Sequence, residues 1–194
     1  MNEAVKQKEL FGRTTIGFWL YLMTDCILFA SLFVTFAVLR TATAGGPSGH
    51  ELFEMPSALA ETLILLTSSY TCGIALIGLN KGSIKQMVAG FVATFLLGAA
   101  FLTIELSEFA KFASEGHDWT QSAFLSSFFT LVGTHGLHIM VALLWLLIIF
   151  VVLMRRGLTE KLRRQITLFG LFWHFVDLVW IFIFTIVYLI GATL

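Results

Sequence analysis

Two side chains that can exchange protons stand in one of the most hydrophobic parts of this chain. His174 and Asp177 are three residues apart in the run FGLFWHFVDLVWIFIFTIVYLIG, which is long and apolar enough to cross a membrane. A spacing of three places both side chains on one face of a helix. Such groups are costly in hydrocarbon, so the run predicts that something in the folded protein holds them there.

Other acids and histidines also lie inside apolar runs, and they fall into two depths. A central group of Asp and His residues lies near the middle of its runs, and an outer group of glutamates lies near their ends. The central group contains Asp25, His135, His138, His174 and Asp177, and the outer group contains Glu61, Glu105 and Glu108. Carboxyl and imidazole groups are stable in hydrocarbon only when neutral or hydrogen-bonded. We therefore expect a structural polar network, with direct proton movement as the alternative.

The same physics predicts where the opening pair points. A lipid-facing position would leave both groups without partners, so we expect His174 or Asp177 to face the span over 122–153 or the span over 15–39. An Asp–His or Glu–His hydrogen bond would satisfy both of its members.

Histidine spacing raises the question of a bound cofactor. His135 and His138 in GTHGLH share one helical face, so they cannot provide the two opposite axial ligands of a single haem. His138 and His174, from two helices, are geometrically allowed, as is a copper or zinc site with His135. The carboxylates offer these histidines a simpler role, so we expect no catalytic residue, cofactor or metal in this chain.

Composition places these residues in a membrane protein. Of 194 residues, 58% are hydrophobic and only 12% are charged, about half the charge of a soluble domain. We expect an all-α fold in which residues 1–194 form one membrane domain. A net charge of zero argues against nucleic acid as a partner. The five predicted spans are residues 15–39, 57–79, 85–110, 122–153 and 165–191.

Basic residues predict the orientation of the spans. Ten lysines and arginines lie in the N-terminal tail and in the second and fourth loops, against two in the other loops. Positive charges remain on the cytoplasmic side, so the N-terminus should be cytoplasmic and the C-terminus periplasmic. The polar first twelve residues indicate that no signal peptide is removed. Glycines in the second and third spans (Gly73, Gly78, Gly90 and Gly98) predict close helix contacts.

Five sequence segments together resemble subunit III of the haem–copper respiratory oxidases, and they occur in the order of that family. They are GFWLYLMTDCILFASLF (17–33), ETLILLTSSYT (61–71), ELSEF (105–109), SSFFTLVGTHGLHI (126–139) and FWHFVDLVW (172–180). The resemblance covers nearly the whole chain from Phe11. It is closest to the bacterial ubiquinol oxidase branch, the cytochrome bo type, which has five spans where the cytochrome c oxidase version usually has seven.

The resemblance implies an accessory role in the bacterial inner membrane. In this family subunit III binds no haem, copper or quinone, and the haems and copper belong to the catalytic subunit. It packs with subunits I, II and IV, supports assembly, stability and sustained proton uptake, and holds phospholipid in a cleft. Asp25 matches an intramembrane acid of the family, as Asp where the seven-span relatives have Glu. The eight acids and histidines are therefore candidates for a polar network or a lipid cleft.

The expected function is that of a non-catalytic subunit III in a proton-pumping quinol oxidase that oxidises ubiquinol and reduces oxygen to water. One alternative is an accessory chain of a nitric oxide reductase, against which the oxidase-like loop 45–56 argues. A haem b anchor that passes electrons to quinone is a second alternative. A small proton-coupled transporter is a third, and the lack of internal repeats and broken helices argues against it.

Overall fold

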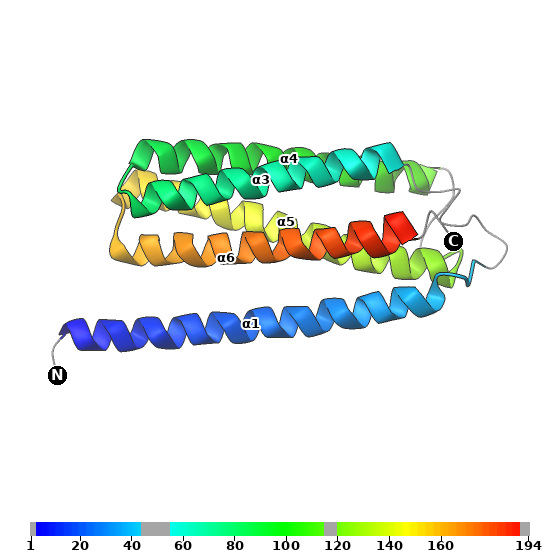
Figure 1. Ribbon diagram of the computed structural model, residues 1–194, viewed down its shortest axis with the longest axis horizontal. Coiled ribbons are helices and arrows are strands. Elements are labelled where there is room, and N and C mark those ends of the chain that lie inside the picture. Colours follow the sequence, from blue (N-terminus) through cyan, green and yellow to red (C-terminus); the bar gives the residue numbers. More distant parts are fainter. Residues whose placement is uncertain (1–2, 44–54, 115–119, 191–194) are drawn as a thin grey trace.

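Five long helices lie side by side along one direction (Figure 1). The computed structural model describes residues 3–43, 55–114 and 120–190, and these residues contain helices and links but no strand. All five helices are long and apolar enough to cross a membrane, which confirms the all-α, five-span prediction. The helices are α1 (Glu3–Leu39), α3 (Met55–Asn80), α4 (Ile84–Ser114), α5 (Ala123–Arg156) and α6 (Glu160–Ile183), and α6 continues into the π-helix η1 (Phe184–Leu189).

The helices extend beyond the predicted spans, most clearly where α5 meets α6. The strongly basic segment 154–164 is helical at both ends, and only residues 157–159 link the helices. The Thr159 hydroxyl begins α6 by accepting a hydrogen bond from Leu162 N at 3.2 Å. Hydropathy detects only the segment inside hydrocarbon, whereas helices continue into the headgroup region. Loop 45–54 and the end of the fifth span beyond Ile190 lie outside the described residues.

The α3–α4 pair is the most closely packed part of the bundle. A Cβ atom added to Gly90 would lie 2.8 Å from Ala75 Cβ and 2.9 Å from Thr71 O, so only glycine allows this approach. Hydroxyl groups join the same interface, since the Thr71 and Thr94 Oγ1 atoms are 2.9 Å apart. Small residues and short polar bonds are the means by which helices associate in lipid.

Aromatic side chains fill the space between α4, α5 and α6. Gly98 of α4 leaves room for Trp173, whose Cη2 would be 2.6 Å from a Cβ at that position. Trp180 packs edge-on against Phe101 with ring centroids 4.7 Å apart, and its Nε1 donates to Thr62 Oγ1 at 3.1 Å. This core holds α6 between α5 and α3.

Helix α1 lies at the edge of the bundle and contacts mainly α5 and α6. Its buried side chains Leu22, Asp25, Phe29 and Phe36 follow the three-and-four spacing of a coiled-coil seam. Its remaining faces are mostly exposed, as a lipid-facing or partner-facing surface would be.

Candidate functional site

The first polar contact inside the bundle joins α1 to α5. His138 Nε2 lies 3.7 Å from Asp25 Oδ2, and its Nδ1 lies 2.7 Å from Thr134 O. The imidazole is thus positioned by its own helix and directed at the carboxyl group of the neighbouring helix. Asp25, which was expected to belong to a polar network, is only 6% exposed at this contact.

His135 lies one turn before His138 but has different surroundings. It is fully buried, and its ring contacts Trp180 at 5.2 Å and Phe101 at 5.9 Å between centroids. No hydrogen-bond partner is found for either ring nitrogen within the described residues. Sequence spacing grouped His135 with His138, whereas the structure directs His138 toward α1 and encloses His135 in an aromatic core.

The third group lies between α6 and α3 and corrects one prediction. Ser69 Oγ lies 2.7 Å from His174 Nδ1, and Asp177 is buried near Ser69 and Cys72. Both residues of the opening pair therefore face α3, not α5 or α1 as expected. Gly170 explains the rotation, because its missing side chain lets Leu76 of α3 approach this face of α6.

The fourth group contains the three glutamates and lies toward the end of the bundle opposite the basic links. Glu61 of α3 and Glu105 of α4 are 0% and 2% exposed, and Glu108 is close enough to interact electrostatically with both. We call these three residues the carboxylate cluster. Glu61 and Glu105 are buried in an apolar bundle, where a charged carboxyl group is costly unless it has a partner.

The π-helix brings a tyrosine to the carboxylate cluster. Each turn of η1 contains an additional residue, and Ile190 N accordingly bonds to Thr185 O five positions back. Val187 and Tyr188 are both buried as a result, and Tyr188 lies within electrostatic range of all three glutamates. Sequence analysis missed Tyr188, because hydropathy gives no signal for a π-helix.

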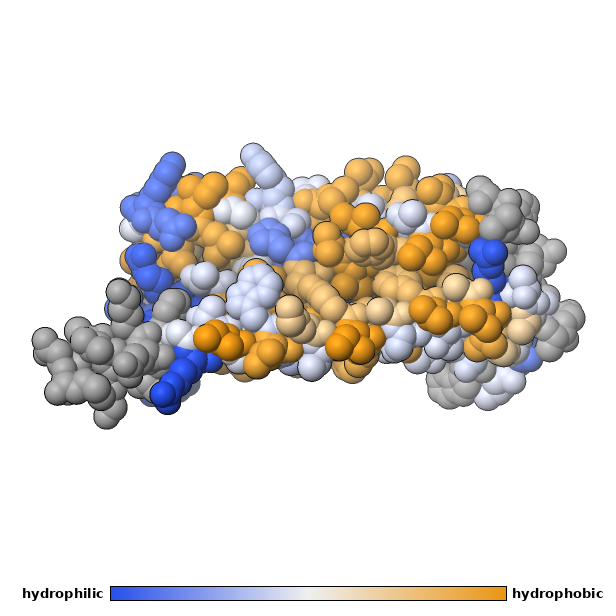
Figure 2. Space-filling view, turned by 60° about the horizontal axis from the view of Figure 1, so that its bottom comes forward, coloured by the Kyte–Doolittle hydropathy of each residue, from blue (hydrophilic) through white to orange (hydrophobic). Residues whose placement is uncertain are grey.

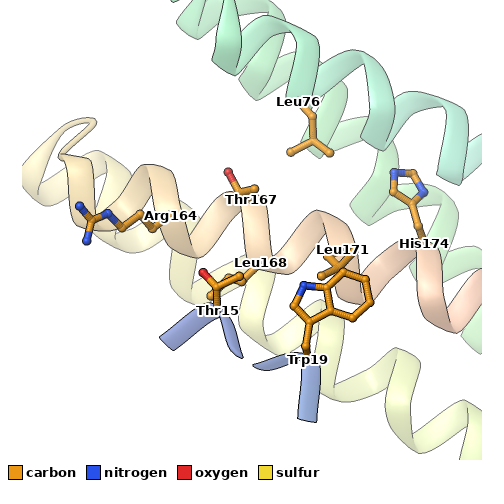
Figure 3. A pocket seen from close by; sticks show the side chains of 8 residues that line it. All are labelled: Thr15, Trp19, Leu76, Arg164, Thr167, Leu168, Leu171 and His174. Carbon is orange, nitrogen blue, oxygen red and sulfur yellow. The ribbon is translucent and has the colours of Figure 1, made fainter. Parts of the chain in front are cut away.

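A hollow of about 360 Å³ opens between α1, α6 and α3 near the basic links (Figure 3). Thr15 and Trp19 reach it from α1, Leu76 from α3, and Arg164 and His174 are among its residues on α6. A second, apolar hollow of about 230 Å³ continues between α1 and α6 toward Phe182. Both hollows are lined almost entirely by apolar atoms.

The histidines of the bundle point toward different helices. His138 is directed at α1 and His174 at α3, so the pair that sequence spacing allowed as haem ligands does not converge. Across the described residues, no three His, Cys, Asp or Glu side chains are grouped as metal ligands. Two polar contacts instead connect helices in pairs, Asp25 with His138 and Ser69 with His174.

Ser69 is a second residue that sequence analysis missed. Its depth offered a signal, because Ser69 lies eleven residues before the end of α3 and His174 fourteen residues after the start of α6. A hydroxyl at the same depth as a buried imidazole is a candidate partner, although many hydroxyls in this chain bond to their own helix.

The fold and its polar groups define a membrane-embedded helical bundle whose intramembrane acids and histidines sit mainly at helix contacts. A model of the family described as cytochrome c oxidase subunit III matches residues 7–192. The chain belongs to this family.

Individual relatives are similar over nearly the full length. Subunit 3 of the cytochrome bo(3) ubiquinol oxidase of Pseudomonas aeruginosa is 55% identical over 93% of this chain and 87% of that protein. Cytochrome c oxidase subunit 3 of Bacillus sp. strain PS3 is 47% identical over 98% and 90%. Quinol oxidase subunit 3 of Bacillus subtilis is 44% identical over 98% and 94%. The chain is thus a multi-pass membrane protein of the subunit III type.

Proposed function

We propose that this chain is the non-catalytic subunit III of a haem–copper quinol oxidase in the bacterial inner membrane. The observation that carries the proposal is full-length similarity to quinol oxidase subunits 3, together with five spans. The complex would oxidise ubiquinol and reduce oxygen to water, and the catalytic subunit would hold the haems and copper. These names favour an oxidase over a nitric oxide reductase.

The way the polar groups are used supports an accessory role for the chain. The Asp25–His138 and Ser69–His174 contacts each join two helices, and the described residues contain no group of three His, Cys, Asp or Glu side chains that could hold a metal. We therefore assign the chain to assembly, stability and sustained proton uptake of the catalytic subunit, in contact with subunits I, II and IV. The phospholipid that the family resemblance implies remains a prediction.

Charge distribution supports the proposed orientation. The basic residues of the α3–α4 and α5–α6 links, together with Arg13, lie at one end of the bundle. This end would be cytoplasmic. Labelling of single cysteines placed in the 157–159 link with a membrane-impermeant maleimide tests it, since whole cells should protect the site and inside-out vesicles should expose it.

The function is tested on a complex that is isolated through a tag on this chain in mild detergent. We expect a haem-bearing chain, quinol-dependent oxygen uptake and a reduced-minus-oxidised haem spectrum, while this chain is colourless after separation. A chain that is isolated alone with haem would be a haem anchor. Nitric oxide consumption without oxygen uptake would identify a reductase.

A further inference from the structure

Two hollows lie along the exposed face of α6. The first lies between α1, α6 and α3 and is lined by Trp19, Leu76, Arg164 and His174, and the second, apolar one lies between α1 and α6 and reaches Phe182. We call the two together the α6 groove. Arg164 and Phe182 are 18 residues apart, or about 27 Å along a helix, which is close to the thickness of the hydrocarbon core.

A polar group lies at the midpoint of this groove. His174 is 14 residues from Glu160 and 15 from Leu189, the ends of its span, and its side chain is exposed. Ser69 Oγ lies within hydrogen-bond distance of Nδ1, but no partner of Nε2 is found among the described residues. Figure 2 shows a hydrophilic patch within the largely hydrophobic surface of this side of the molecule.

Lipid alone is an unfavourable environment for the exposed His174 side chain. Acyl chains offer no hydrogen bond, and histidines within spans almost always face protein or a water-filled cavity. Tyr70, next to Ser69 in the chain, is 71% exposed and adds a second polar group at this depth. Gly73, one turn further along α3, has nothing within 4 Å of a Cβ position, so another backbone can approach closely here.

We propose that the α6 groove receives a transmembrane helix of another oxidase subunit, and that this helix presents a hydrogen-bonding side chain to His174 Nε2. The inference rests on the proposed function and adds to it the face through which the complex forms. The exposed imidazole at mid-span and the open backbone at Gly73 together match a partner helix, whereas the apolar hollow alone would equally fit an acyl chain.

Photo-cross-linking in native membranes tests the occupant directly. A benzophenone amino acid replaces Leu178 in the groove or, as a matched control, Leu144 on the outer face of α5; the two side chains are 53% and 54% exposed. We expect Leu178 to capture a peptide from a membrane span of a co-purified oxidase chain, and Leu144 to capture mainly lipid. Lipid adducts alone at Leu178, or adducts with a second copy of this chain, would overturn the proposal.

Substitution of the imidazole tests the hydrogen bond. His174→Ala should lower the fraction of this chain that stays in the detergent-solubilised complex about three- to tenfold, as loss of one interhelical hydrogen bond would. His174→Gln keeps a hydrogen-bonding group and should retain most of the complex, and Leu144→Ala should retain all of it. Full retention with His174→Ala, or equal loss with both His174 variants, would refute the role of the imidazole.

The experiments distinguish a wrong function from a wrong occupant of the α6 groove. If no haem-bearing chain accompanies the wild-type protein, the proposed function is wrong, and the groove proposal is wrong with it. If the haem-bearing chain is present but the groove captures only lipid, the function stands and the α6 groove is a lipid site.

Discussion

The α3–α4 interface and the boundary between α1 and α6 are both helix contacts in lipid, yet one is sealed and the other is open. At α3–α4, Gly78 and Gly90 bring the backbones together, and a Cβ on Gly78 would lie 2.7 Å from Met87 N. Between α1 and α6, large side chains such as Trp19 and Phe33 line hollows of about 360 and 230 Å³.

The difference shows what closes a helix pair where the solvent itself is apolar. Burial of hydrophobic surface gives little gain between helices in lipid, so close packing and hydrogen bonds decide the association. α3 and α4 provide both, through glycines and the Thr71–Thr94 hydroxyl pair. α1 provides an aromatic seam toward α5 and the polar contact Asp25–His138, and two hollows remain along its α6 side.

The largest expected effect comes from a substitution that separates α3 from α4. Gly90→Ala places a methyl group 2.8 Å from Ala75 Cβ and 2.9 Å from Thr71 O, and a backbone carbonyl cannot easily retreat. We expect a loss of about 1–3 kcal/mol, as for other overpacked cores. Unfolding of the purified chain in a titration of mild detergent with SDS measures it.

The matched control for this prediction lies on the partner helix. Gly73→Ala adds the same methyl group where nothing lies within 4 Å, so stability should not fall. Equal losses in both variants would mean that glycine content, and not the close approach of α3 and α4, determines stability.

A smaller effect is expected at the Asp25–His138 contact between α1 and α5. Asp25→Ala leaves His138 without its carboxyl neighbour and should loosen α1 at a cost of about 1 kcal/mol, because the 3.7 Å approach is longer than a hydrogen bond. A double-mutant cycle with His138→Ala isolates the contact, and we expect the two losses to be non-additive. Strict additivity would show that the 3.7 Å approach contributes nothing to stability.

The smallest expected effect comes from removing one hydroxyl group at the α3–α4 interface. Thr94→Val keeps the shape of the side chain but removes the bond to Thr71, and should cost about 0.6 kcal/mol. Thr103→Val on the exposed face of α4 removes only a bond to its own helix, at Ala99 O, and should be nearly neutral. The same SDS titration compares the two, and a greater loss with Thr103→Val would contradict the interface role.

The sequence predicted how deep each polar residue of the site lies in the membrane. A position within an apolar run places a residue along the membrane normal, so the separation of Asp25 and His138 from the carboxylate cluster was visible beforehand. Which helix each side chain faces was not visible. His174 or Asp177 was expected to face α5 or α1, but both lie against α3. His135 and His138 lie three residues apart on one helix yet have different neighbours.

The sequence by itself determined the class of protein, its five spans, the depth of its polar residues and its family, because these depend on local hydropathy and on short motifs. The tertiary structure alone decided how each helix is rotated about its axis, which pairs are sealed and where the α6 groove opens. Nearly every face of a membrane helix is apolar, so composition does not indicate its inner side. Contacts between distant residues, such as Gly170 with Leu76 and His174 with Ser69, set that rotation.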